Sequence, residues 1–224
     1  MVNITRRAWL AALGLAPVAG GLGADVASTK SNKYNFQSIP PRELIRRLHF
    51  PNVELVTHEG KKVRFYDDLI KDKNVVINFM YAHCERICPP VTSNMVRVQK
   101  RLHDRIGHDI FIYSITLQPE EDTPKVLKEY AKAHGVGPGW LFLTGKPADI
   151  ELLRRALRFA YDDPTEDADK SNHIGNLRYG NEPAVRWAAC PGQAPADWVA
   201  TSILGEADGP TWVAGVRARL AAAR

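Results

Sequence analysis

Two cysteines, Cys84 and Cys88, stand four positions apart where a strand-like pattern gives way to a helical one. Residues 75–80 form an apolar run typical of a buried strand, and the helical pattern follows Pro90. The N-terminus of a helix stabilises negative charge, so it favours the thiolate over the thiol. Two thiolates that face one volume either exchange disulfides or hold a soft metal such as Cu(I). We therefore expect redox or metal chemistry at this pair.

The other sulfur and imidazole side chains have weaker patterns. His83 adjoins Cys84, but adjacent side chains point apart, so we interpret His83 as tuning the charge near the pair. Met80 and Met95 fall on apolar faces, where core packing is expected. Cys190 is either a buried free thiol or a third redox participant that resolves a mixed disulfide. No mutual spacing suggests a site among His49, His58, His103, His108 and His134.

The composition of the 224 residues is that of an ordinary globular protein, 45% hydrophobic and 25% charged, and allows one well-buried core. The formal net charge is +5, but the basic residues form no run interleaved with aromatic side chains. Nucleic acid is therefore not an expected partner. A mild positive surplus is compatible with association with an anionic membrane surface.

Residues 1–24 have the pattern of an export signal. The adjacent Arg6 and Arg7 precede a Gly- and Ala-rich apolar run to about residue 22, and small residues follow. The arginine pair resembles a twin-arginine signal, which exports folded proteins. We therefore expect a periplasmic protein, tethered to the membrane if the signal stays uncleaved. In an oxidising compartment, two neighbouring thiols form a disulfide unless a reductant or a metal prevents it.

The segments around the cysteines alternate between strand and helix patterns. Residues 25–40 are a polar linker, 41–48 a short helix, and two alternating runs at 53–57 and 62–65 predict a hairpin. The pattern then predicts strands at 75–81, 109–117 and 140–144, and helices at 91–106, 124–134 and 146–160. Thr123 is expected to cap the second of these helices, with Pro124 as its first residue. This order predicts an α/β fold with a mixed central sheet between helices.

The part of the chain beyond these elements begins with an acidic segment, residues 161–172, which is expected to form a surface loop. Its charges either form a solvated face or dock a basic partner. They are Asp162, Asp163, Glu166, Asp167 and Asp169. His173 follows and begins a short segment that runs to Tyr179. We expect a main domain at 41–180 and a C-terminal extension at 181–224, with helices near 196–204 and 211–223.

Four stretches of the chain resemble the Sco/SenC family. They are residues 76–79 leading into the H-C-E-R-I-C-P run at 83–89, residues 114–124 with their S-I-T, P-E and D-T-P elements, the K-E-Y-A run at 128–131, and residues 140–145. The resemblance covers roughly residues 50–180 and implies a thioredoxin-like fold with an inserted β-hairpin. The chain departs from the family pattern at Gln118 and in the residues around His173.

This resemblance implies copper binding in the assembly of a respiratory copper enzyme, notably at the binuclear copper site of cytochrome c oxidase. Family members bind copper with the two motif cysteines and one distant histidine, which correspond here to Cys84, Cys88 and His173. Two thiolates and an imidazole suit Cu(I), and a further ligand would admit Cu(II). The expected partners are an apo copper protein, such as a cytochrome c oxidase subunit, and a thioredoxin-like reductant.

Other functions remain open for the cysteine pair. A thiol–disulfide oxidoreductase would reduce the cysteines of a copper-site apoprotein, with Cys84 attacking and Cys88 resolving. A peroxidase on the same fold would need an activated cysteine beside Thr92 and Arg86. A structural disulfide would place an inert bridge near the distance limit across one helical turn. A closed zinc site would need four ligands, and no second Cys or His pair in the sequence completes one.

Overall fold

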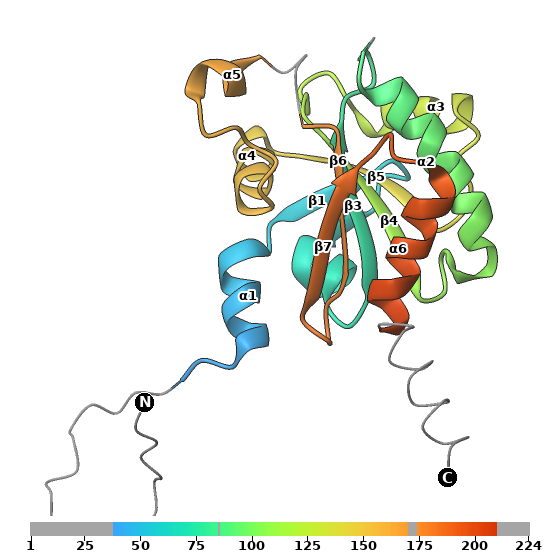
Figure 1. Cartoon of the computed structure of the whole chain (residues 1–224). Helices are drawn as coiled ribbons and strands as arrows, with labels where there is room; N and C mark the ends of the chain where they lie inside the picture. Colours follow the sequence, from blue (N-terminus) through green and yellow to red (C-terminus); the bar gives the residue numbers. More distant parts are fainter. Residues whose placement is uncertain (1–37, 85, 170–173, 210–224) are drawn as a thin grey trace, which may run out of the picture. The chain divides into compact units, whose positions relative to one another are not determined.

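The computed structural model describes residues 38–84, 86–169 and 174–209 (Figure 1). The predicted export signal, the linker up to residue 37, His173 and the predicted helix at 211–223 lie outside these residues. Contacts within the chain separate Met1–Ser38 from a unit that begins at Ile39, and this unit holds all the described helices and strands. None of the described helices is both long and apolar enough to cross a membrane.

A seven-stranded mixed sheet forms the centre of this unit, in the order β2-β1-β5-β4-β3-β6-β7. Its middle is three parallel strands, β3 (Asn74–Met80), β4 (Ile110–Thr116) and β5 (Trp140–Gly145). Every β3 residue after the first is buried, as expected for a strand covered on both faces. The register aligns Met80 with Thr116, so the loops after β3 and β4 leave the sheet side by side.

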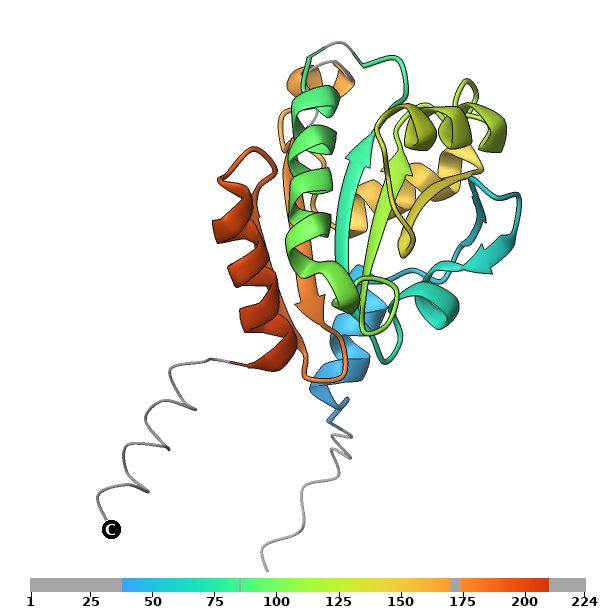
Figure 2. The same ribbon diagram turned by 90° about the vertical axis from the view of Figure 1, so that its right-hand side faces the viewer.

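Helices cover both faces of the sheet (Figures 1 and 2). On one face lie α2 (Cys88–Leu102), α3 (Pro124–Ala133) and α6 (Ala196–Asp208), and on the other α1 (Pro41–His49) and α4 (Pro147–Ala156). The crossovers from β3 to β4 and from β4 to β5 move in one direction, and right-handed connections then place α2 and α3 on one face. The predicted α/β class, with a mixed sheet between helices, is confirmed.

Antiparallel hairpins extend the sheet at both edges. The predicted N-terminal hairpin is confirmed as β1 (Glu54–Thr57) and β2 (Lys62–Arg64), and β1 also pairs with β5. A π-helical turn, Phe65–Ile70, leads from it to β3. At the other edge, β6 (Asn176–Asn181) pairs with β3 and with β7 (Arg186–Pro191). The sequence did not predict β7. This strand of the central sheet lies within the expected C-terminal extension at 181–224.

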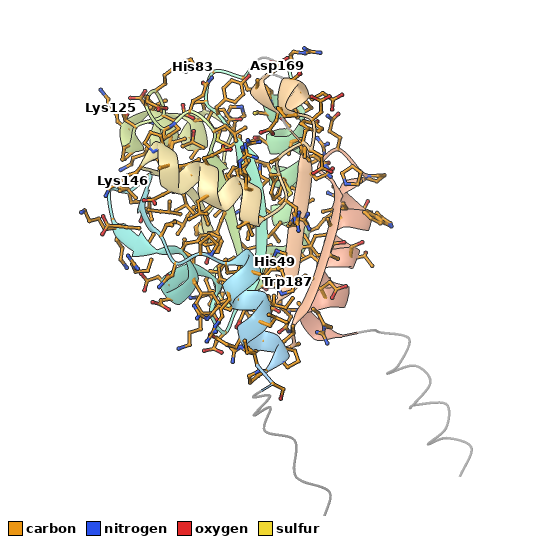
Figure 3. All side chains as sticks on the ribbon, turned by 90° about the vertical axis from the view of Figure 1, so that its left-hand side faces the viewer. His49, His83, Lys125, Lys146, Asp169 and Trp187 are labelled. Carbon is orange, nitrogen blue, oxygen red and sulfur yellow. The ribbon has the colours of Figure 1, made fainter. Side chains whose placement is uncertain are left out.

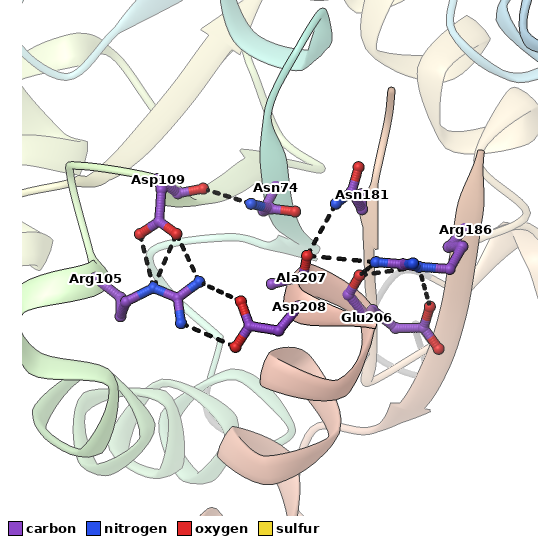
Figure 4. Close-up of polar contacts among 8 residues, drawn as sticks. All are labelled: Asn74, Arg105, Asp109, Asn181, Arg186, Glu206, Ala207 and Asp208. Atoms are coloured by element: carbon purple, nitrogen blue, oxygen red, sulfur yellow. Dashed lines mark hydrogen bonds and ion pairs between the residues drawn. The ribbon is translucent and has the colours of Figure 1, made fainter. Parts of the chain in front are cut away.

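Polar contacts fasten the last turn of α6 to its neighbours (Figure 4). They join Arg105 to Asp208, Arg186 to the carbonyl of Glu206, and the Asn181 side chain to the carbonyl of Ala207. Carbonyls at a helix C-terminus have no partner within the helix, so these bonds satisfy groups that would otherwise need water. Helix α6 is therefore packed into the same unit as the sheet.

Two helices end earlier than the sequence predicts. The helix expected at 91–106 ends at Leu102, and a 3-10 turn, His103–Arg105, follows. The helix expected at 146–160 ends at Ala156, because Arg158 adopts a left-handed backbone conformation with φ of 61° that stops it. The apolar pattern continues past this end because Leu157 and Phe159 are still buried.

The acidic segment at 161–172 is more structured than the predicted surface loop. It contains a short helix, α5 (Pro164–Ala168), and one of its carboxylates, Asp167, is buried. Arg154 of α4 donates to both oxygens of Asp167 at 2.5 Å. A bidentate pair of this kind fixes α5 against α4. Asp167 therefore belongs neither to a solvated face nor to a docking patch.

Candidate metal centre

The loop between β3 and α2 carries both cysteines. It turns directly after the strand, where the Cys84 N–H donates to the Tyr81 carbonyl at 3.3 Å. Cys88 is the first residue of α2, so its N–H has no partner within the helix, and it donates to Cys84 Sγ at 3.3 Å. The two cysteines are not joined in a disulfide, and the residues are exposed by only 5% and 2%. The two sulfurs thus converge at the strand-to-helix junction.

The pKa values of the two thiols are shifted in opposite directions. Burial opposes ionisation of Cys84, but hydrogen bonds from the Cys88 thiol, from the backbone at Cys88 and Arg86 and from the Tyr81 hydroxyl hold the Cys84 pKa below its ordinary value. The pKa of Cys88 is raised, first by burial and then by the hydrogen bond it shares with Cys84. Cys84 is therefore the sulfur that ionises first, as a nucleophile or a soft metal ligand must.

A buried carboxylate from the next loop holds the cysteine loop in place. The Ala82 N–H donates to Asp122 at 3.2 Å (Oδ1) and 3.1 Å (Oδ2), and the Thr116 hydroxyl donates to Oδ2 at 2.5 Å. Asp122 is fully buried, which raises its pKa. Since Thr116 ends β4 and Ala82 follows β3, the parallel register brings these groups together.

The role of Asp122, which lies between the predicted strand at 109–117 and the predicted helix at 124–134, was not predicted from the sequence. The signal was present in the order of the elements. A polar loop after one parallel strand lies beside the loop after the neighbouring strand, because both leave the same edge of the sheet. The carboxylate of the D-T-P run was therefore a candidate for contact with the cysteine loop.

A buried hydroxyl pair joins α2 to α3 next to the cysteines. Thr92 Oγ1 and the Tyr130 hydroxyl lie 2.9 Å apart, and both side chains are buried. Burial raises the pKa of Tyr130 to about 12, so the phenol stays neutral. Thr92 is thereby engaged in helix packing, and Arg86 is exposed. This geometry lends no support to the peroxidase alternative.

His173 lies outside the described residues, but the chain on both sides of it is described. Gly175 lies so close to Ile87 that a Cβ atom on it would be 2.7 Å from Ile87 Cγ2. Asp169, on the other side, contributes to the environment of Tyr81, whose pKa rises to about 12 through burial first and contact with Cys84 second. Figure 3 shows Asp169 and His83 at the same edge of the molecule. Both flanks of segment 170–173 therefore lie beside the cysteine loop.

Within the described part of the chain, no group of three or more His, Cys, Asp or Glu side chains could hold a metal ion. Met80 and Met95 are buried in the core, as predicted. Cys190 is a buried thiol opposite Leu177 in the β6–β7 hairpin, and burial raises its pKa to about 11. His58 accepts a hydrogen bond from the Phe142 N–H, so it helps to hold the N-terminal hairpin.

Comparison with known proteins gives a match to the SCO1/SenC family model over residues 48–177. The SCO1 protein homolog of Bacillus subtilis is 36% identical over 88 residues, which are 39% of this chain and 44% of that protein. A putative copper-binding protein of Stutzerimonas stutzeri is 30% identical over 136 residues, 60% of this chain and 65% of that protein. The chain thus spans less than two thirds of the length of either relative.

Among solved structures, that of BsSco is 25% identical, with a TM-score of 0.57, over 70% of this chain and 91% of that chain. BsSco is described as a member of the Sco family of cytochrome c oxidase assembly proteins in which a disulfide switch was identified. The likeness of the two backbones confirms the predicted thioredoxin-like architecture.

Proposed function

The chain belongs to the SCO1/SenC family, and on this premise we propose that it is a copper metallochaperone. Cys84 and Cys88 bind Cu(I), His173 completes the site, and the loaded protein passes the metal to an apo copper protein. The observation that carries the proposal is the convergence of two buried sulfurs at the start of α2. The name of the Stutzerimonas relative, a putative copper-binding protein, supports the choice of metal.

The donor set of the described site fits Cu(I). Thiolates are soft ligands, which Cu(I) prefers, and two or three of them are enough to bind it. A structural zinc site, in contrast, needs four protein ligands. The N–H groups around Cys84 already stabilise a thiolate there. Cys88 keeps its proton in the free protein, so metal binding releases that proton and becomes weaker as the pH falls.

The assignment of His173 as the third ligand depends on the position of the neighbouring residues of the chain. Ile174 alone separates His173 from Gly175, which packs on Ile87 between the two cysteines in sequence. Because consecutive Cα atoms are about 3.8 Å apart, position 173 stays within about 8 Å of the Gly175 Cα atom. The proposed third ligand is therefore tethered to Gly175, whose neighbour Ile87 belongs to the cysteine loop.

Transfer of the metal proceeds by ligand exchange without a change of oxidation state. Thiolate or imidazole ligands of the client replace the cysteines one at a time, and each released sulfur takes up a proton. The raised pKa of Cys88 makes it the sulfur that is protonated more readily, so it is released first. Cys84, which stays ionised more easily, is the last to leave the metal.

We also propose a client protein and a cellular compartment. The client is the subunit of cytochrome c oxidase that carries the binuclear copper site, which is consistent with the assembly role given for the family of BsSco. The compartment is the periplasm, because residues 1–24 have the pattern of a twin-arginine signal. Copper loading of that subunit by the purified protein, and export of a fusion that carries residues 1–24, test the two parts separately.

The test of metal binding is a competition titration of the reduced protein against a Cu(I) chelator. We expect one Cu(I) per chain, no tight binding by Cys84→Ser or Cys88→Ser, and weaker binding by His173→Ala. His108→Ala is the matched control, since it removes an exposed imidazole far along the sequence from the cysteines. Failure of the reduced protein to bind Cu(I), or equal affinity of His173→Ala and His108→Ala, would refute the site as proposed.

A second candidate function is thiol–disulfide exchange, favoured by the unequal acidities of the adjacent thiols. The Cys84 thiolate attacks a client disulfide, forms a mixed disulfide and releases one client thiolate. Cys88, once deprotonated, attacks Cys84 Sγ, frees the second client thiolate and leaves a Cys84–Cys88 disulfide. A thioredoxin-like dithiol then supplies the two electrons that restore the pair. Client reduction that is lost in Cys84→Ser but intact in His173→Ala would favour this function over copper delivery.

A further inference from the structure

An apolar pocket of about 160 Å³ lies away from the cysteines, among α1, the end of α4 and the β6–β7 hairpin. Its apolar walls include Ile45, Phe50, Leu157 and Trp187. Figure 3 shows His49 and Trp187 close together, well below His83 and Asp169 in the view. A cavity of about 150 Å³ is large enough for a benzene-sized guest. The pocket therefore has the size of a small-molecule site that is separate from the proposed metal centre.

Two of the polar side chains that line this pocket are cationic. Arg158 and Arg178 both line it, and no carboxylate in the described part of the chain forms an ion pair with either. Arg178 donates to the Arg158 carbonyl at 3.4 Å and lies 5.7 Å from the centre of the Phe159 ring. Burial, and then the charge of Arg158, lower the pKa of Arg178. Two cationic side chains in the lining of one pocket favour an anion there.

Arg178 is partly buried and Arg158 is exposed, whereas buried and partly buried arginines elsewhere pair with carboxylates. Arg42 bonds to Glu182, Arg105 to Asp109, and Arg154 to Asp167. The pocket also holds His49, whose Nδ1–H donates to the Ala156 carbonyl at 3.0 Å, which leaves Nε2 as the other polar atom of the ring. Among the partly buried arginines that the structure describes, Arg178 alone has no carboxylate partner.

Arg158 also occupies a strained backbone position. It follows α4 with φ of 61°, and the hydrogen bond from the Phe159 N–H to the Arg154 carbonyl at 2.8 Å closes the helix in the way that usually employs glycine. A left-handed conformation is unfavourable for a residue with a Cβ atom. Glycine would adopt this conformation without strain, yet the chain has an arginine here, and this residue lines the pocket. Strain of this kind is typical of functional positions.

We propose that this pocket binds a small carboxylate with a compact apolar body. The apolar body lies against Phe50, Leu157 and Trp187, and the carboxylate lies between Arg158 and Arg178. The planar guanidinium fork matches a carboxylate by two parallel hydrogen bonds, which an uncharged amide of the same shape does not reproduce. The pocket volume limits the body to about the size of one aromatic ring.

The test uses benzoate as the probe and benzamide as its uncharged isostere. In ¹H–¹⁵N spectra of the labelled protein, the indole N–H signal of Trp187, identified by its loss in Trp187→Phe, should shift with benzoate and saturate. We expect a Kd on the order of 1 mM, as is usual for a ligand of this size, and at least tenfold weaker binding of benzamide. Arg178→Gln should weaken benzoate binding by about tenfold, while Arg64→Gln, on the distant β2 strand, should not change it.

Arg158→Gly separates binding from folding. Glycine relieves the left-handed strain, so this variant should melt at a higher temperature than the parent protein and yet bind benzoate about tenfold more weakly. Cys84→Ser should bind benzoate normally, so this result and the copper titration fail or succeed independently. The proposal is overturned by a shift that does not saturate, by equal responses to benzoate and benzamide, or by unchanged affinity in both Arg178→Gln and Arg158→Gly.

Discussion

At the scale of single residues, the chemistry of the site depends on the environment that turns two identical side chains into different groups. Cys84 receives hydrogen bonds that favour its ionised form, whereas burial dominates at Cys88. The sequence predicted the pair at the junction of strand and helix, and it named Cys84 as the attacking thiolate of the oxidoreductase alternative. The expectation that the helix N-terminus favours a thiolate is met at Cys84 but not at Cys88, where burial raises the pKa. It did not predict Asp122, whose bonds to the Ala82 N–H depend on the register of β3 and β4. A contact between two loops cannot be predicted from the pattern within either of them.

The asymmetry of the thiols leads to a prediction about their alkylation. Cys84 should react with iodoacetamide well before Cys88, because only the thiolate reacts and the Cys84 pKa is lowered while that of Cys88 is raised. The measurement is mass spectrometry of peptides from the reduced protein after brief labelling at a series of pH values. Cys190, whose pKa is raised to about 11, is the internal control and should react slowly. Equal labelling of Cys84 and Cys88 near neutral pH would contradict the described geometry.

At the scale of elements, hydrophobic periodicity predicted the central strands and helices but not every end. Periodicity predicted a helix at 146–160 that in fact ends at Ala156, because Leu157 and Phe159 are still buried after the backbone has left the helix. It also missed β7, whose residues are mostly half-buried and lack a clear alternation. The acidic composition of 161–172 suggested solvent exposure, but a single buried arginine on α4 reverses that expectation for Asp167.

The Arg154–Asp167 pair makes stability depend on pH. Hydrogen bonds from Arg154 hold the pKa of Asp167 below its ordinary value, so the stability it contributes is complete above about pH 4 and is lost as the pH falls further. Asp167→Asn should lower the free energy of unfolding by about 3 kcal/mol at neutral pH, since it leaves a buried guanidinium without this partner. It should also flatten the acid limb of the stability curve.

Urea unfolding between neutral and acid pH measures both effects. Glu166→Gln, at an exposed neighbouring position of α5, is the control and should change little. An Asp167→Asn protein as stable as the parent at neutral pH, or with the same acid limb, would show that the pair does not hold α5 to α4.

Two glycines that flank β6 and β7, Gly175 and Gly192, lie close to each other, and Gly192 also lies close to α2. This packing leads to a second prediction at this scale. Gly192 donates to the Gly175 carbonyl at 2.8 Å, and a Cβ atom on Gly192 would lie 2.7 Å from that oxygen and 2.8 Å from Val91. Gly192→Ala should therefore destabilise the protein by about 1–3 kcal/mol, because backbone and α2 must both shift. Gly205→Ala on α6 meets nothing within 4 Å and should stabilise it by about 0.5–1 kcal/mol. Thermal unfolding of the two variants distinguishes a tight approach from a loose one.

At the scale of the whole molecule, the family match ends at residue 177, but the packed unit does not. Strand β7 completes the sheet edge, and α6 packs on α2, the helix that begins at Cys88. The sequence predicted an extension beyond residue 180 without predicting this dependence, because the pairing of β6 with both β3 and β7 is a property of the assembled sheet. The family resemblance predicted the fold of the matched residues, but it made no prediction for residues 178–209, which follow the match.

A chain that ends after Asn181 should therefore fail to fold cooperatively. It exposes the outer edge of β6 and the apolar side of α2 that α6 covers, and an unpaired edge of this kind promotes aggregation. The measurement is solubility and thermal unfolding of the shortened protein. A chain that ends after Gly209 keeps all of these contacts and is the control. A soluble, cooperatively folding chain that ends after Asn181 would show that residues 182–209 are dispensable for the fold.

In the proposed site, two sulfurs and one imidazole of this chain share a copper ion, and X-ray absorption of the Cu(I)-loaded, reduced protein detects each of these ligands. We predict two sulfur ligands and one nitrogen ligand in the parent protein, and loss of the imidazole signal in His173→Ala but not in His108→Ala. A copper spectrum without sulfur ligands, or one that is identical in the parent protein and His173→Ala, would contradict the account.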